Sequence, residues 1–253
     1  MKSRRLAEME SYILSNGSVT MEELRDHFGI SMNTVRRDIA EIVRPGYIVK
    51  VYGGVKAETK VPALVPYSVR STSPSTVKQK ICQAAGEMVK DGDIIFIDSG
   101  TTTVHIMDAI QDKNITVITN NIEVMIQALE HENIRIIVVP GEIHRKTHSI
   151  TGEDSAAFLS HLNTDIAFMA ATGASLSGVT NSSPLEYSIK RAAVAYTKRA
   201  VLLVTGGKFG ITSLLTYASL SQFHSVITDS SIAPEYREKL DELNVNLVVV
   251  DEK

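Results

Sequence analysis

Hydrophobic residues in the first 57 positions recur at the spacing of short helices and then alternate with polar residues. The helical pattern predicts three helices, at 3–16, 21–29 and 32–44. Alternation over 47–55, with a turn at Gly53 and Gly54, predicts a hairpin. Two helices joined by a tight turn and followed by a hairpin make up a winged helix-turn-helix, which we expect for residues 1–57.

Local signals mark the ends of the second and third helices. Thr20 and Glu23 have the spacing of a capping box, Gly29 is placed to end the second helix, and Ser31 is placed to begin the third. The side chains expected to face the interior of this domain are Leu6, Met9, Ile13, Leu14, Leu24, Phe28, Val35, Ile39 and Ile42.

A different pattern begins at residue 77, where short apolar runs alternate with helical stretches. These runs are 93–98, 115–119, 134–139, 165–171, 200–205, 225–229 and 246–250. They are apolar on both faces, which predicts an α/β fold with a mostly parallel sheet covered by helices on both sides. Ligands of such sheets bind at the carboxyl ends of the strands. We therefore expect a larger ligand-binding domain at 77–253, joined to the first by a proline-containing linker at 58–76.

The third helix carries polar side chains opposite its apolar stripe. They can bond phosphates and base edges in a DNA major groove, and they are Ser31, Asn33, Thr34, Arg36 and Arg37. A solvated charged face is the alternative, but the turn spacing and the wing favour DNA binding. On the wing, we expect contacts to the DNA backbone from Lys50, Tyr52 and Lys56. Residues 1–60 carry ten Lys or Arg and eight Asp or Glu, whereas the whole chain has a net charge of −3.

The stretch from Ile94 to Ile110 has the pattern of a phosphate cradle. An apolar strand runs into Asp98, Ser99 and Gly100, and three threonines at 101–103 then lead into a helix. Free N–H groups at a helix N-terminus favour an anion, and a glycine lets it approach. The loop has neither the lysine of a nucleotide P-loop nor a GxGxxG sequence. An ordinary helix cap is the alternative interpretation.

Further polar residues follow other strands of the predicted sheet. Asn120 and Asn121 could contact sugar hydroxyls, although Asn121 could also cap a helix. The stretch from 140 to 155 is expected to be a basic loop whose Arg145 closes over an anion; the spacing of its two histidines does not indicate a metal site. The remaining candidates are Thr172, Gly173, Glu186 and Lys208. For Glu186, an exposed i, i+4 salt bridge to Lys190 is the alternative.

Composition adds limits on location and redox chemistry. The longest apolar runs are too short to span a bilayer, and the N-terminus lacks the apolar segment of a secretory signal. The single cysteine, Cys82, lies at a helical core spacing and is expected to be a buried, inert thiol. These features predict a cytoplasmic protein with no contact to membranes.

Several of these motifs together resemble the DeoR family of bacterial transcription regulators. They are NTVRRDIAEI, KVYGGV, IFIDSGTTT, VITNN and a late KFG, and the resemblance covers essentially the whole chain. It implies a winged-helix domain and an effector domain of the ribose-5-phosphate isomerase and CoA-transferase type. It also implies that a phosphorylated sugar lies on Ser99, Gly100, Thr101, Thr102 and Thr103, in a pocket lined by Asn120, Asn121, Thr172, Gly173, Glu186 and Lys208.

The resemblance also implies a biological role. The chain would repress a sugar or polyol catabolic operon by binding double-stranded operator DNA as a homodimer or homotetramer. A phosphorylated intermediate would release it, and motifs such as TNSSPLEYSIKR favour inositol breakdown. One departure from the family is Thr205-Gly206-Gly207, where a polar pair often precedes Lys-Phe-Gly.

A sugar-phosphate isomerase with an extra N-terminal domain is the alternative function. Such an enzyme needs a general base beside the substrate carbon. Related isomerases place paired carboxylates where this chain has MAATGASLSG, and there is no Asp or Glu between Met169 and Gly178. We therefore expect a sensor rather than an enzyme, without catalytic residues, cofactor or metal.

Overall fold

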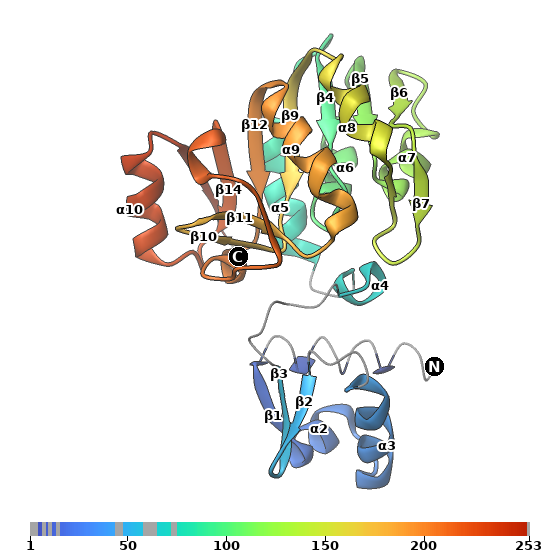
Figure 1. Ribbon diagram of the computed structural model, residues 1–253, viewed down its shortest axis with the longest axis vertical. Coiled ribbons are helices and arrows are strands. Elements are labelled where there is room, and N and C mark those ends of the chain that lie inside the picture. Colours follow the sequence, from blue (N-terminus) through green and yellow to red (C-terminus); the bar gives the residue numbers. More distant parts are fainter. Residues whose placement is uncertain are drawn as a thin grey trace. The chain divides into compact units, whose positions relative to one another are not determined.

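The chain divides into two compact units, Met1–Ser73 and Pro74–Lys253. A computed structural model (Figure 1) describes residues 5–6, 9, 12–13, 16–43, 48–57, 65–71 and 75–251. The expected first helix falls only partly within these residues, and those of its positions that are described are helical. Leu14, one of the expected core residues, lies outside them.

The first unit contains a helix-turn-helix and a three-stranded antiparallel sheet. Its elements are β1 (Ser18–Thr20), α2 (Met21–Phe28), α3 (Met32–Ile42), β2 (Ile48–Val51) and β3 (Gly54–Ala57). The strand order is β1-β3-β2, so the predicted hairpin gains a third strand, β1, that the sequence pattern did not predict.

Capping side chains define the turn between α2 and α3. The Thr20 hydroxyl accepts from the Glu23 N–H, and the Glu23 carboxylate accepts from the Thr20 N–H, which completes the predicted capping box. Gly29 then ends α2 at φ 59°, a left-handed conformation that glycine adopts without strain, and Ser31 caps α3. The three predicted boundaries, at the start and end of α2 and at the start of α3, are confirmed.

The interior of this unit is formed by the apolar side chains that face one another across the helices and the sheet. The buried ones are Met9, Ile13, Val19, Leu24, Val35, Ile39, Ile42, Ile48 and Val55. Leu6 and Phe28 are only half-buried against this group. Asp38 is also fully buried, and one of its carboxylate oxygens lies 2.8 Å from Nε of Arg5.

The larger unit is built on a seven-stranded parallel sheet with the order β15-β14-β12-β9-β4-β5-β6. Its strands are β4 (Ile94–Ile97), β5 (Ile115–Thr119), β6 (Ile134–Val138), β9 (Thr164–Ala170), β12 (Thr197–Leu203), β14 (Ser225–Asp229) and β15 (Asn246–Val250). Each of the seven apolar runs forms one of these strands, so this prediction is confirmed.

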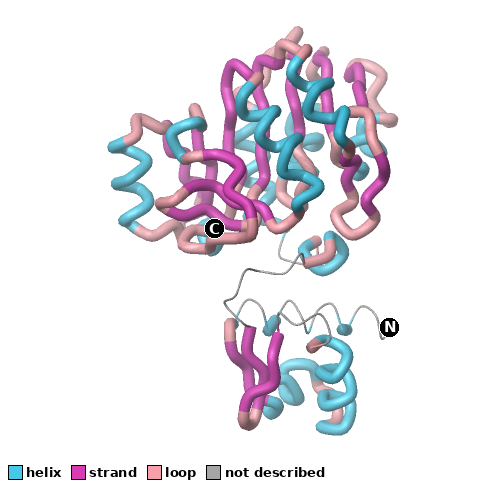
Figure 2. The backbone as a smooth tube through the Cα atoms, in the orientation of Figure 1, coloured by secondary structure: helices cyan, strands magenta, loops and turns pink. Residues whose placement is uncertain are grey.

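Helices cover both faces of the sheet (Figures 1 and 2), which explains why its strands are apolar on both sides. In β9, Ala167 and Met169 pack in the cluster that includes residues of α8 and α9, whereas Ile166 and Phe168 pack in the cluster of α5 and α6. The helices are α5 (Ser75–Gly86), α6 (Ile106–Ile110), α7 (Ile122–Ala128), α8 (Glu153–Ser160), α9 (Tyr187–Ala195) and α10 (Pro234–Glu242).

The structure adds elements that the sequence pattern did not predict. A small antiparallel sheet consists of β10 (Gly173–Ser175), β11 (Gly178–Asn181) and β13 (Leu215–Ala218). The stretch expected to be a basic loop instead forms a hairpin, β7 (Glu142–His144) and β8 (Ser149–Thr151), so that expectation was wrong. A short helix, α4 (Tyr67–Arg70), lies within the expected linker.

Candidate functional site

The residues of α3 that were expected to contact DNA lie on its polar face. Asn33, Arg36 and Arg37 are exposed, and their side chains make no hydrogen bond to any other residue in the described part of the chain. Ser31 and Thr34 are used locally, because their hydroxyls lie 2.9 Å apart at the start of the helix. The face therefore offers one amide and two guanidinium groups to a partner.

The wing places its three expected contacts on different sides. Tyr52 is fully exposed in the turn between β2 and β3. In the antiparallel register Lys50 lies opposite Val55, and Lys56 lies opposite Val49. Because adjacent residues of a strand point to opposite faces, Lys50 and Lys56 project from opposite faces of the hairpin. The two lysines do not form one basic patch.

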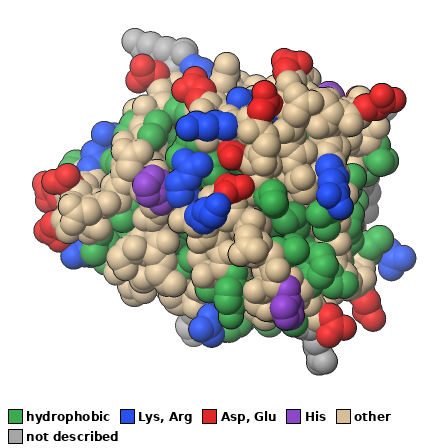
Figure 3. Space-filling model, turned by 90° about the horizontal axis from the view of Figure 1, so that it is seen from above, with side chains coloured by type: hydrophobic (Ala, Val, Ile, Leu, Met, Phe, Trp, Pro, Cys, Tyr) green, Lys and Arg blue, Asp and Glu red, His purple; other side chains and the backbone are tan. Residues whose placement is uncertain are grey.

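On the face seen in Figure 3, basic and acidic side chains are scattered among apolar and uncharged ones. No single sign of charge dominates this face.

The phosphate-cradle sequence follows β4 and is buried throughout, from Asp98 to Thr103. The Thr103 hydroxyl donates to the carbonyl of Asp98 at 2.7 Å, and it begins a short 3-10 helix, η1 (Thr103–His105), that leads into α6. At Gly100, an added Cβ would lie 2.6 Å from Cβ of Ala170 on β9. This glycine is therefore required by packing of the loop against β9, and not only by the approach of a ligand.

Helix α5 contacts the cradle from one side. Nζ of the buried Lys78 lies 3.4 Å from Oγ1 of Thr101, and the Cys82 thiol donates to the carbonyl of Thr102 at 3.0 Å. Burial raises the pKa of the Cys82 thiol, as expected for an inert cysteine. Lys78 was missed by the sequence analysis, since nothing local to it indicates that α5 brings it to a loop 23 residues further on.

Two neighbouring asparagines at the end of β5 have contrasting environments. Asn121 caps α7 by accepting from the Glu123 N–H at 3.1 Å, and it donates to the carbonyl of Gly100 at 3.3 Å. Asn120 is fully buried, yet neither its amide nitrogen nor its carbonyl oxygen has a hydrogen-bond partner among the described residues. The hydroxyl of Thr102 is likewise buried without a partner. Unpaired buried polar groups of this kind are uncommon and suit a site that receives a polar ligand.

A buried ion pair lies directly beneath the cradle. Nζ of Lys190, on α9, contacts a carboxylate oxygen of Asp98, which also accepts from the Ala170 N–H at 2.9 Å. Burial raises the pKa of Asp98, and the charge of Lys190 opposes that effect. The expected alternative, an exposed salt bridge between Glu186 and Lys190, was wrong: both side chains are buried, and Lys190 pairs with Asp98.

Glu186 connects two strands, β8 and β11, to the cradle. Its Oε1 accepts from the Ser99 hydroxyl at 2.8 Å and from the Ser149 hydroxyl of β8 at 2.9 Å. Its Oε2 accepts from the Asn181 amide of β11 at 2.9 Å. Burial alone would raise the pKa of Glu186, but Lys190 and these three donors hold it below its usual value.

The carboxylates of Asp98 and Glu186 therefore lie at the cradle, although the segment from Met169 to Gly178 contains no Asp or Glu. Oδ2 of Asp98 is occupied by Lys190 and a backbone N–H, whereas its Oδ1 is buried without a hydrogen-bond partner among the described residues. Glu186 has a lowered pKa and three donors, which makes it a weak base.

The remaining predicted residues are only partly brought together. Thr172 donates to Oδ1 of Asn181 at 3.2 Å, and Nζ of Lys208 donates to the carbonyl of Ala171 at 2.8 Å, so both lie at the end of β9. An added Cβ at Gly173 would lie 2.3 Å from the carbonyl oxygen of Ile211, which indicates a packing role. Arg145 is exposed in the β7–β8 turn and makes no hydrogen bond to the other described site residues.

The two histidines of the hairpin have partners that are not metals. Nδ1 of His144 lies 2.8 Å from the Thr147 hydroxyl, and Nδ1 of His148 lies 2.8 Å from Oε1 of Glu123. Within the part of the chain that the structure describes, no group of three or more His, Cys, Asp or Glu side chains could hold a metal ion. None of the described helices is long and apolar enough to cross a membrane.

Each of the two units matches a known protein family. The DeoR-like helix-turn-helix domain matches residues 5–61, and the DeoR C terminal sensor domain matches residues 74–230. The chain belongs to the DeoR family. It is therefore a transcriptional regulator with a DNA-binding domain and a sensor domain, not an enzyme.

Individual regulators are similar along almost the whole length of this DeoR-family chain. The HTH-type transcriptional regulator IolR of Bacillus subtilis is 41% identical over 98% of this chain and 99% of its own. The glycerol-3-phosphate regulon repressor of Escherichia coli is 28% identical over 86% of this chain and 87% of its own.

Solved structures are similar in part. Ribose-5-phosphate isomerase A of Methanocaldococcus jannaschii, 19% identical, covers 54% of this chain and 55% of its own with a TM-score of 0.40. The translation initiation factor eIF-2B of Pyrococcus horikoshii, 16% identical, covers 83% of this chain and 74% of its own with a TM-score of 0.44.

Proposed function

We propose that this DeoR-family regulator represses a sugar or polyol catabolic operon and leaves its operator when a phosphorylated intermediate binds the cradle. The observation that carries the proposal is the coexistence of two features in one chain. One is a helix face with free guanidinium groups, and the other is a buried loop with unpaired polar groups.

A phosphorylated effector suits the chemistry of the cradle. Hydroxyls and backbone groups of Ser99 to Thr103 bind an anion without bringing a permanent charge. Lys78 at Thr101 and Lys208 at the end of β9 supply positive charge nearby. The Escherichia coli relative is named for glycerol 3-phosphate, a phosphorylated polyol. The motif resemblance and the 41% identity to IolR make a phosphorylated inositol-breakdown product the first effector to test.

The output side is tested by substituting the two arginines of α3. Arg36→Ala and Arg37→Ala should each weaken operator binding in a gel shift, and a phosphate-contacting arginine should also reduce the salt dependence by about one unit of slope. Arg25→Ala is the matched control, because Arg25 is exposed on α2 and pairs with Asp26. Unchanged affinity in both α3 variants would exclude this face as the DNA contact.

The input side is tested at the cradle. Thr102→Ala and Lys208→Ala should keep operator affinity and require higher concentrations of phosphorylated effector for release. Lys198→Ala, an exposed lysine paired with Asp165, should respond as the unmodified chain does. If both cradle variants release DNA at ordinary effector concentrations, the effector binds elsewhere.

A further inference from the structure

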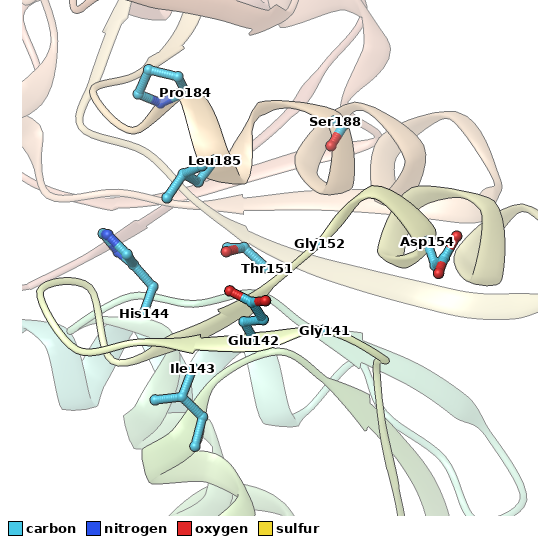
Figure 4. A pocket seen from close by; sticks show the side chains of 10 residues that line it. All are labelled: Gly141, Glu142, Ile143, His144, Thr151, Gly152, Asp154, Pro184, Leu185 and Ser188. Carbon is cyan, nitrogen blue, oxygen red and sulfur yellow. The ribbon is translucent and has the colours of Figure 1, made fainter.

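A cavity lies between the β7–β8 hairpin and the segment that precedes α9. Its volume is about 630 Å³, within the range of small-molecule sites. In Figure 4 the side chains of Glu142, His144 and Thr151 point into this space from the hairpin, and Leu185 faces them from the opposite side. Ile143 points away, as strand alternation requires.

The lining of this cavity differs chemically from the cradle. It includes the carboxylates of Glu142 and Asp154, the imidazole of His144 and the hydroxyls of Thr151 and Ser188, and no Lys or Arg. Two carboxylates without a cation repel an anionic ligand such as a sugar phosphate. The same carboxylates accept hydrogen bonds from hydroxyl groups, and Leu185 and Pro184 offer apolar surface to a C–H face. This lining suits an uncharged polyhydroxy compound.

The cavity is separated from the cradle by a buried hydrogen-bonded chain. Ser149 and Glu186 lie between the two, with relative exposures of 0% and 5%. From the cavity inward, Nδ1 of His144 lies 2.8 Å from the Thr147 hydroxyl, which lies 2.7 Å from the Ser149 hydroxyl. Ser149 then donates to the same Glu186 oxygen that accepts from Ser99 of the cradle.

We propose that this cavity binds an unphosphorylated polyhydroxy compound and that the chain from His144 to Ser99 couples its occupancy to the cradle. A hydroxyl compound that engages His144 changes the hydrogen bonding of Thr147 and Ser149. Ser149 and Ser99 share one oxygen of Glu186, so a change at Ser149 alters the hydrogen bond that holds the Ser99 hydroxyl. Coupling between two binding sites is reciprocal, so an anion in the cradle changes polyol affinity by the same factor.

Direct binding tests the site itself. The full chain is titrated calorimetrically with neutral polyols (inositol, sorbitol and glucose) and, separately, with inorganic phosphate. At least one polyol should bind, and Glu142→Gln should weaken that binding about tenfold or more, as expected for loss of a charged hydrogen-bond acceptor. Glu130→Gln, an exposed carboxylate outside the cavity, is the matched control.

Three results would overturn the assignment. The first is that no polyol binds. The second is that Glu130→Gln weakens polyol binding as much as Glu142→Gln does. The third is that Thr102→Ala loses polyol binding, which would place the polyol in the cradle. The last variant also separates this proposal from the phosphate site, because it should lose affinity for phosphate and keep affinity for the polyol.

The coupling is tested by interrupting the chain within the protein. Thr147 is buried, and Thr147→Val keeps its shape while removing the hydroxyl between His144 and Ser149. In the unmodified chain a saturating polyol should change phosphate affinity severalfold, and in Thr147→Val this factor should fall to about one while the polyol still binds. The coupling would be refuted if the polyol changed phosphate affinity equally in Thr147→Val and in the unmodified chain. It would also be refuted if the polyol did not change phosphate affinity in the unmodified chain.

Discussion

Asn120 and Asn121 are adjacent and equally buried, but only one of them has its hydrogen bonds satisfied. The side chain of Asn121 holds the first turn of α7 and the Gly100 carbonyl, which makes it part of the support of the cradle. The side chain of Asn120 supports nothing by hydrogen bonding within the described residues. The two residues therefore have different roles, which their shared sequence motif does not reveal.

This contrast gives a paired prediction. Asn121→Ala should lower the free energy of unfolding by about 1 kcal/mol, because the helix cap is lost. Asn120→Ala should leave stability unchanged or slightly higher, since an unpaired buried polar group is removed, and should weaken effector binding. Urea unfolding and effector titration of both variants measure these effects. A larger loss of stability in Asn120→Ala than in Asn121→Ala would contradict the assignment.

The buried pair of Lys190 and Asp98 gives a second prediction at this scale. Lys190→Met should lower the free energy of unfolding by about 3–5 kcal/mol near neutral pH, because it leaves the Asp98 charge buried without its partner. Lys198→Met removes an exposed pair with Asp165 and should cost less than about 1 kcal/mol. Urea unfolding of the two variants compares a buried ion pair with an exposed one.

The pH dependence of Lys190→Met has a definite sign. Burial raises the pKa of Asp98 in the folded chain, and removal of Lys190 raises it further. As the pH falls from neutral toward about 4, the ordinary pKa of an Asp carboxyl, folded Asp98 takes up a proton before its unfolded counterpart does. The stability deficit of the variant should therefore shrink over this interval. A deficit that grows on acidification would show that Asp98 is not the stranded charge.

At the scale of elements, the hydrophobic pattern was sufficient to predict the seven-stranded sheet and helix α3. All seven apolar runs became strands. The five inner strands are largely buried between helices and so keep a continuous apolar sequence, whereas the edge strands β6 and β15 are partly exposed. The strands at 173–175, 178–181 and 215–218 were missed because they are short and contain Gly, Ser and Thr instead of an alternating apolar pattern. The hairpin from 142 to 151 was missed because each of its strands has only three residues and most of these residues are polar.

The candidate site was predictable only where its residues follow one another in sequence. The cradle and the two asparagines follow strands of the parallel sheet, so their common edge could be inferred. Lys190 and Asp98 are 92 residues apart, and the local i, i+4 spacing of Glu186 and Lys190 pointed to the wrong partner. Helix α5 supplies Lys78, and β8 supplies Ser149, through tertiary contacts that have no local signal in the sequence.

The packing of the cradle loop against β9 gives a prediction about its glycine. Gly100→Ala should lower the free energy of unfolding by about 1–3 kcal/mol, because the new methyl group would overlap Ala170. The double variant with Ala170→Gly should recover most of the loss. Gly207→Ala is the control, since an added Cβ there meets no atom within 4 Å. Thermal and urea unfolding of the three variants measure the effect, and equal costs at 100 and 207 would contradict it.

At the scale of the whole molecule, DNA reading and effector sensing belong to separate compact units. We propose that effector binding changes how copies of the chain are held together on DNA. In a homodimer, two-fold symmetry would impose symmetric half-sites on the operator.

This arrangement predicts a dependence on helical phase. If one α3 from each protomer enters the major groove of one half-site, inserting about 5 base pairs between the half-sites turns the second site to the opposite face of the duplex. Affinity should then fall to the level of a single half-site, and an insertion of about 10 base pairs should restore part of it. Gel shifts with the natural operator and these two insertions measure the effect, and scrambled flanking sequence serves as the control. Equal affinity for all spacings would mean that each half-site is bound independently, and the effector would then have to act within a single chain.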